Sequence, residues 1–179
     1  MPIAYVHISD IHFGQEKKGG QIVIHDDAKA RLIDDVAAEV KKLPNGRADG
    51  IIVTGDIAYA GKGPEYTSAG EWLDNLAAAA GCKITDIQVV PGNHDIDLDN
   101  ISPGTKLMLA GIIEKGEDEL DLYLDSQQDR ESLYTRFHAY RPFAEAYNCS
   151  LDCTGGLASD KIIELSTPAP RGAQGPIND

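Results

Sequence analysis

The sequence has few basic residues. Lys and Arg number 16 against 29 Asp and Glu, which gives a formal net charge of -13. Binding to the phosphates of nucleic acids requires clusters of Lys and Arg, so this balance argues against strong nucleic-acid binding by the chain. It does not argue against a nucleotide substrate, because divalent cations can supply positive charge locally.

The sequence also lacks long apolar runs and a basic, apolar leader. No stretch approaches the roughly 18 apolar residues of a membrane-spanning helix, and the first residues, MPIAYVHISD, are unlike a signal peptide. The three cysteines are an odd number, and Cys149 and Cys153 have no second pair beside them. We therefore expect free thiols, a cytoplasmic location and no association with membranes.

Three short β-type runs are present, at residues 4–8, 50–54 and 87–90, and helical patterns at 28–42 and 65–80 alternate with them. This order predicts right-handed βαβ units, a largely parallel sheet and the α/β fold class. The apolar residues of the second run are continuous, which favours a strand covered on both faces. No G-x-G-x-x-G or Walker-type loop follows any of the strands, so a simple nucleotide-binding α/β protein is disfavoured.

The character of the sequence changes after residue 100. Apolar spacing predicts helices at 106–113 and 133–147, the second interrupted near Pro142, and the acidic stretch 114–131 is expected to be a solvated face. A further strand is expected at 161–165. The expected organisation is a βαβαβ core at 1–100, a helical acidic insertion at 101–150 and an irregular tail at 151–179.

Polar residues follow each of the three predicted strands. Asp10 and His12 follow the first, Asp56 the second, and Asn93 and His94 the third. The carboxyl ends of parallel strands meet at one edge of a sheet, where ligands bind. Asp10 and His12 are two residues apart, so they point the same way and can reach one ion. Carboxylate, imidazole and amide oxygen together suit Mn²⁺, Fe or Zn²⁺, and the sequence therefore predicts a metal site.

Three of these segments, DIH at 10–12, GDI at 55–57 and GNHD at 92–95, resemble the first three motifs of the calcineurin-like metallophosphoesterases. The resemblance implies the N-terminal part of a four-layer α/β/β/α sandwich, with a helical insertion after the third strand and two divalent metal ions. It implies these roles: Asp10 and His12 bind the first metal, Asp56 bridges both, Asn93 binds the second, His94 is the general acid, and Asp95 orients its imidazole.

The activity that this resemblance implies is phosphoester hydrolysis by in-line attack of a metal-bound hydroxide. Phosphodiesters, nucleotides included, are favoured as substrates, because Asp95 rather than a Glu follows Asn-His. The resemblance does not extend to the later motifs of the family. Complete members carry a further His and a later Gly-His-x-His as metal ligands, whereas only His138 follows the third motif here. Its helical context favours a surface or capped histidine.

Three accounts of the missing ligands stay open. The chain is the front part of a longer protein, whose remainder or a partner supplies the His ligands; or it is a catalytically silent interaction or regulatory module; or it is a one-metal variant. Two other histidines are expected outside the site. His7 is expected to pack against a helix, and His25 to open a helix with Asp26 or Asp27 as its N-cap.

Overall fold

A computed structural model describes residues 3–15 and 22–149. Its strands form one parallel sheet in the order β1–β2–β3, with Val6 beside Ile51 and Ile51 beside Ile87. The strands are β1 Tyr5–Ile8, β2 Gly50–Thr54 and β3 Ile87–Val90. The predicted α/β class and parallel sheet are confirmed.

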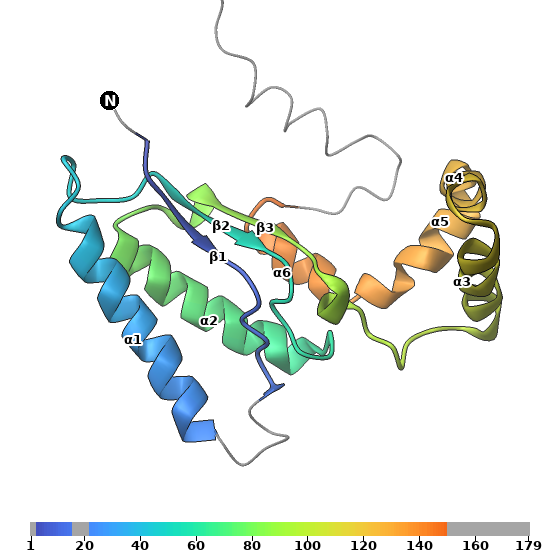
Figure 1. Ribbon diagram of the computed structural model, residues 1–179, viewed down its shortest axis with the longest axis horizontal. Coiled ribbons are helices and arrows are strands. Elements are labelled where there is room, and N and C mark those ends of the chain that lie inside the picture. Colours follow the sequence, from blue (N-terminus) through green and yellow to red (C-terminus); the bar gives the residue numbers. More distant parts are fainter. Residues whose placement is uncertain (1–2, 16–21, 150–179) are drawn as a thin grey trace, which may run out of the picture.

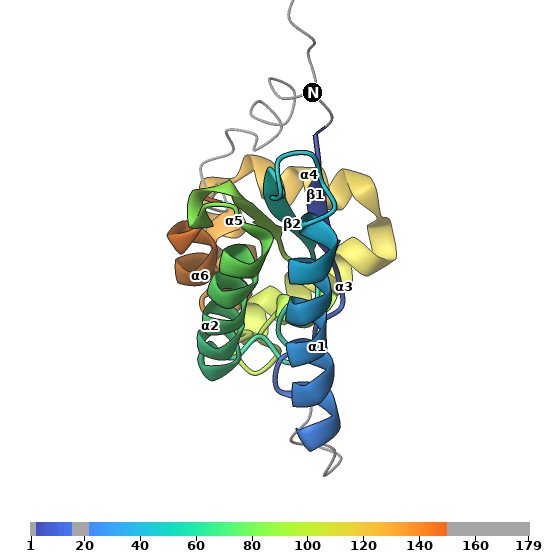
Figure 2. The same cartoon turned by 90° about the vertical axis from the view of Figure 1, so that its left-hand side faces the viewer.

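Two long helices cover one face of the sheet. They are α1, Ile22–Val40, and α2, Gly63–Ala80, which pack against each other. Figures 1 and 2 show them side by side beneath the strands. Ile51, Val53 and Ile87 point into this layer and are fully buried. The short helices η2, Ile84–Asp86, and η3, Asn93–Asp95, flank β3.

Both long helices start earlier than the sequence pattern predicts. α1 begins at residue 22 instead of 28, so Asp26 and Asp27 lie inside the helix and do not cap it. After the glycines at 19 and 20 no glycine or proline occurs before Pro44, so nothing in the sequence delays the helix start. α2 begins at Gly63 with Pro64 in its first turn, where a missing N–H costs nothing.

The other face of the sheet carries mixed side chains. Tyr5, His7 and Val90 are exposed there, and Ile52 is half-buried. His7 does not pack against a helix as expected, because strand alternation directs its side chain away from the helix layer. Its Nε2 lies 2.8 Å from Thr54 Oγ1. Among the described residues only one face of β2 is covered, which differs from the expected burial on both faces.

Three helices after β3 lie together to one side of the sheet, and we call them the arm (Figure 1). The arm consists of α3 Pro103–Lys115, α4 Glu117–Asp125 and α5 Gln127–Tyr134. The acidic stretch is helical, and Glu117, Asp118, Asp121 and Asp125 on α4 are exposed, as expected of a solvated face.

The chain returns to the core through η4, Thr135–Phe137, and α6, Tyr140–Ala146, which packs against α2. The predicted interruption of this helical region therefore precedes Pro142. That residue lies in the first turn of α6, where proline is tolerated.

Cys82 and Cys149 are free thiols, as expected. Cys153 and the predicted strand at 161–165 lie outside the described residues. No helix in the described part of the chain is both long and apolar enough to cross a membrane.

Candidate metal centre

The loops that follow β1 and β2 run side by side beyond the end of the sheet. Asp10 N–H donates to the Gly55 carbonyl at 3.3 Å, and His12 N–H donates to the Asp56 carbonyl at 3.0 Å. A parallel bridge between Phe13 and Ala58 continues this pairing. The first two polar segments are thus held together by backbone hydrogen bonds, as their positions after neighbouring strands predict.

The backbone of both loops is strained. Asp10, His12 and Asp56 have φ values of 58°, 51° and 52°, in the left-handed region that non-glycine residues seldom adopt. Asn148 is the only other such residue in the described segments. Each such conformation costs on the order of 1 kcal/mol or more and persists where the surrounding structure imposes it, often at functional sites.

The loop after β3 approaches the second loop through two glycines. A Cβ on Gly55 would lie 3.0 Å from Gly92 Cα, and a Cβ on Gly92 would lie 2.2 Å from Asp56 Oδ1. His94 N–H donates to that same Oδ1 at 2.9 Å. The Asp56 carboxylate therefore sits against the third loop with no room for a side chain at position 92.

His12, Asp56 and His94 form the centre of the site. One ligand atom from each lies within 4.8 Å of the other two, and all three residues are half-buried. The two imidazole rings meet edge to face at 4.7 Å between centroids. His12 Nδ1 is buried and has no hydrogen-bond partner among the described residues. His12 and Asp56 thus bring together an imidazole and a carboxylate, which are donors that suit a divalent transition metal, and the His94 imidazole lies beside them.

The His94 ring is oriented by Tyr59. His94 Nδ1 lies 2.9 Å from the Tyr59 carbonyl oxygen, and the two rings stack with centroids 5.5 Å apart. A carbonyl oxygen can only accept, so this contact requires the proton on Nδ1. Nε2 is then the ring nitrogen that can bind a metal or exchange a proton.

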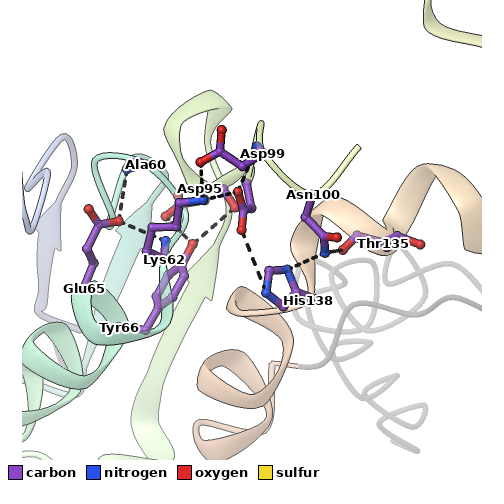
Figure 3. Close-up of polar contacts among 10 residues, drawn as sticks. Ala60, Lys62, Glu65, Tyr66, Asp95, Asp99, Asn100, Thr135 and His138 are labelled. Carbon is purple, nitrogen blue, oxygen red and sulfur yellow. Dashed lines mark hydrogen bonds and ion pairs between the residues drawn. The ribbon is translucent and has the colours of Figure 1, made fainter. Parts of the chain in front are cut away.

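Asp95 is fully buried, and in the described part of the chain the hydrogen bonds to its carboxylate come from backbone N–H groups and one hydroxyl. Oδ1 accepts from Ala58 N–H at 2.8 Å and from the Tyr66 hydroxyl at 2.9 Å. Oδ2 accepts from Gly92 N–H at 2.9 Å and from Ile57 N–H at 3.1 Å. Figure 3 shows Tyr66 reaching Asp95 from α2.

Further along the same loop, Asp97 joins the third loop to its surroundings. Its carboxylate contacts Lys62, and its backbone N–H donates to the Arg136 carbonyl. Lys62 also binds Asp99 at 2.7 Å (Figure 3). Burial would raise the pKa of Asp97, but the hydrogen bond from Lys62 and that from the Asp99 backbone lower it overall. The hydrogen bonds to Asp97 and Asp99 raise the pKa of Lys62.

A family model described as calcineurin-like phosphoesterase matches residues 3–170. The chain belongs to the calcineurin-like phosphoesterase family. One similar protein is the uncharacterized metallophosphoesterase-like protein YydB of Bacillus subtilis (strain 168), which is 34% identical over 100 residues. The matched stretch covers 55% of this chain and 19% of that relative, so the chain spans about a fifth of the relative's length.

The calcineurin-like motifs are brought to one edge of the sheet, but not all of their side chains join the central group. Asp10 and Asn93 are exposed, and Asp10 lies outside the cluster of His12, Asp56 and His94. Their individual roles as ligands stay predictions. The role that the resemblance implied for Asp95 also stays a prediction: His94 Nδ1 contacts the Tyr59 carbonyl, and the Asp95 carboxylate accepts hydrogen bonds from backbone N–H groups and from Tyr66.

His138 lies away from this group. Its Nδ1 is 3.1 Å from Asn100 Nδ2, and its Nε2 is 3.9 Å from Asp97 Oδ2 (Figure 3). The sequence reasoning missed Tyr59, Lys62 and Tyr66. The contact of His94 with the Tyr59 carbonyl leaves no signal in the sequence, because every residue carries that group. For Lys62, the alternation of Asp95, Asp97 and Asp99 was a detectable signal that a cation would lie nearby.

Proposed function

We propose that this chain forms the metal centre of a metal-dependent phosphoester hydrolase that favours phosphodiesters, nucleotides included. The observation that carries the proposal is the convergence of His12, Asp56 and His94 within 4.8 Å at the end of the sheet. The unpaired Nδ1 of His12 supports it. The preference for diesters rests on the family pattern, in which Asp95 stands where other members have Glu.

Two divalent cations, Mn²⁺, Fe or Zn²⁺, would be held by Asp10, His12, Asp56 and Asn93, with Asp56 shared between them. When bound, such cations act as Lewis acids on phosphoryl oxygens and make water a nucleophile at neutral pH. The left-handed backbone at Asp10, His12 and Asp56 supports this assignment, since strained backbone of this kind is concentrated at functional sites.

His94 would act as the general acid. The Tyr59 carbonyl fixes the proton on Nδ1, so Nε2 is the atom that can donate a proton to the leaving-group oxygen. Stacking on Tyr59 and the hydrogen bond from His94 N–H to Asp56 restrict both its ring and its backbone.

The remaining His ligands would come from a longer chain or from a partner. No histidine follows His138 in this sequence, and the Bacillus relative extends far beyond the matched stretch. The native transcript, sequenced past the codon for Asp179, is expected to continue in frame and to encode Gly-His-x-His. An immediate stop codon would rule out the longer chain and leave a partner that supplies the ligands, a one-metal variant or a catalytically silent module.

A cytoplasmic location is part of the same proposal. It is supported by the free thiols of Cys82 and Cys149, which are typical of a reducing compartment. Fractionation of the producing cells, with the protein detected in the soluble cytosolic fraction, would test it.

The test of function is hydrolysis of bis(p-nitrophenyl) phosphate, compared with p-nitrophenyl phosphate, by the chain loaded with Mn²⁺ or Zn²⁺, alone and with the segment that carries the missing His ligands added in trans. Asp56→Asn is expected to abolish metal binding and hydrolysis together. Asp121→Asn on the exposed face of α4 is the matched control and should change neither. His94→Ala should keep metal binding and lose about 10²–10⁴-fold in rate on an ester with a poor leaving group.

The alternative function is a catalytically silent interaction or regulatory module. It predicts no metal-dependent hydrolysis even when the segment with the missing His ligands is added in trans. Metal-dependent hydrolysis that disappears in Asp56→Asn would exclude this alternative.

A further inference from the structure

The second and third loops are joined by one buried carboxylate. Asp95 has none of its surface exposed, and its two oxygens accept hydrogen bonds from Ile57, Ala58 and Gly92 backbone N–H groups and from the Tyr66 hydroxyl. Ile57 and Ala58 directly follow Asp56, and Gly92 directly precedes Asn93 and His94. The carboxylate therefore ties together the two backbone segments from which the candidate metal ligands project.

Tyr66 fixes the orientation of that carboxylate. It is 4% exposed, lies in the first turns of α2, and packs against Tyr140 and Phe143. Burial, followed by the negative charge of Asp95, raises the pKa of Tyr66 well above its usual range, so the hydroxyl remains a donor. It is the only side chain among the described residues that hydrogen-bonds to the carboxylate; the other donors are backbone groups.

We infer that Tyr66 and Asp95 form a positioning pair that holds Asp56 against the third loop and so sets the affinity of the metal centre. The inference rests on the proposed function, because it assigns these residues a role toward the same site. Asp56 is held in a left-handed conformation, and its Oδ1 lies 2.2 Å from the position that a Cβ at residue 92 would take. Small shifts of either loop would move this carboxylate, and residues that orient ligands typically change metal affinity by about 10–100-fold when removed.

Tyr140 provides a matched control. It lies in the same aromatic cluster, is 1% exposed, and its hydroxyl has no hydrogen-bond partner among the described residues. Tyr66→Phe and Tyr140→Phe therefore each remove one buried hydroxyl and keep the ring, but only the first removes a hydrogen bond to Asp95. A general loosening of the core would affect both variants alike.

The experiment measures Mn²⁺ affinity of the chain by electron paramagnetic resonance, and amide hydrogen exchange of Ile57, Ala58 and Gly92 without metal. Tyr66→Phe is expected to lower Mn²⁺ affinity about tenfold and to speed exchange at these amides, whereas Tyr140→Phe changes neither. Asp95→Asn should lower Mn²⁺ affinity and speed exchange at these amides more strongly than Tyr66→Phe. The amide NH₂ group cannot accept a hydrogen bond, and the single amide oxygen cannot accept from all four donors.

Equal behaviour of Tyr66→Phe and Tyr140→Phe in both measurements would overturn the inference. Faster exchange in Tyr66→Phe with unchanged Mn²⁺ affinity would overturn it too, because the pair would then have no effect on the metal centre. If the unmodified chain binds no Mn²⁺ even with the segment that carries the missing His ligands added in trans, the proposed metal chemistry fails. The exchange comparison then decides by itself whether Tyr66 and Asp95 hold the loops together.

Discussion

The sheet core and the arm of this chain differ in how they are held together. In the core, strands from distant parts of the sequence pack on α2, and Ile51, Leu73 and Leu76 are fully inaccessible to solvent. In the arm, only Thr105 and Leu133 are buried, while Ile113 is 85% exposed. The core depends on long-range packing, whereas the arm depends on contacts between helices that follow one another in the sequence.

This difference explains where the candidate site lies. Strained backbone at Asp10, His12 and Asp56 has to be stabilised by surrounding structure, and only the packed core provides it. The arm begins and ends beside the third loop, where Asn100 Nδ2 donates to the Thr135 carbonyl at 3.4 Å. The two ends of the arm lie next to the site, but the arm supplies none of His12, Asp56 and His94.

The largest expected effect is on stability, which a substitution in the core should lower far more than a substitution in the arm. Leu76→Ala, at a position with no exposed surface, should lower the free energy of unfolding by about 2–5 kcal/mol, because it leaves a cavity between α2 and its neighbours. Ile113→Ala in the arm should change it by less than about 0.5 kcal/mol. Urea unfolding followed by circular dichroism measures both. Similar losses in the two variants would show that the arm is covered in solution.

The next largest effect is on Mn²⁺ affinity, for which we compare substitutions at two glycines. Gly92→Ala should abolish or strongly reduce Mn²⁺ binding, because the new Cβ would lie 2.2 Å from Asp56 Oδ1 and displace that carboxylate. Gly104→Ala at the start of the arm is the control, since its Cβ would lie 3.7 Å from Ser102 Oγ, an ordinary contact. Isothermal titration with Mn²⁺ is the measurement. Normal affinity in Gly92→Ala would contradict the assignment of Asp56 as a ligand.

The strands and helices of the core were predictable from the sequence because the patterns that indicate each of them lie within short stretches. Apolar strands followed by Asp10, Asp56 and His94 predict a parallel sheet with ligands at one edge, and the structure has that sheet. The contacts within the site were less predictable. The Tyr59 carbonyl and the backbone N–H groups around Asp95 belong to every residue type alike, so no pattern of side chains could indicate them.

The third prediction removes the arm. Because Asn100 and Thr135 are in contact, residues 101–134 can be replaced by a short Gly-Ser linker. The closure cost of such a linker is small, so the free energy of unfolding should change by no more than about 1 kcal/mol. Mn²⁺ affinity is expected to stay within about threefold of the intact chain. Loss of binding together with an intact core would show that the arm helps to position the third loop.

The smallest expected effect is on the pH dependence of stability, for which we compare one ion pair in the core with one in the arm. Burial alone would raise the pKa of Asp97, but the hydrogen bonds from Lys62 and from the Asp99 backbone N–H lower it below its usual range. The hydrogen bonds to Asp97 and Asp99 raise the pKa of Lys62 above its usual range. A lowered carboxyl pKa gives stability that is lost as pH falls through the folded value. A raised ammonium pKa gives stability that is lost as pH rises through the folded value.

The difference in stability between the unmodified chain and Lys62→Met should therefore be greatest between about pH 4 and 10.5 and decrease at both extremes. His138 and Asp99 also face this pair, so each is kept unchanged. Lys115→Met in the arm is the comparison: Lys115 pairs with Glu119 at 3.0 Å, with its own side chain 60% exposed. Thermal unfolding across pH should show a smaller effect for Lys115→Met, and one that salt removes more fully, because solvent screens exposed pairs. Equal effects in the two variants would mean that the partial burial of Asp97 gives the core pair no advantage over the arm.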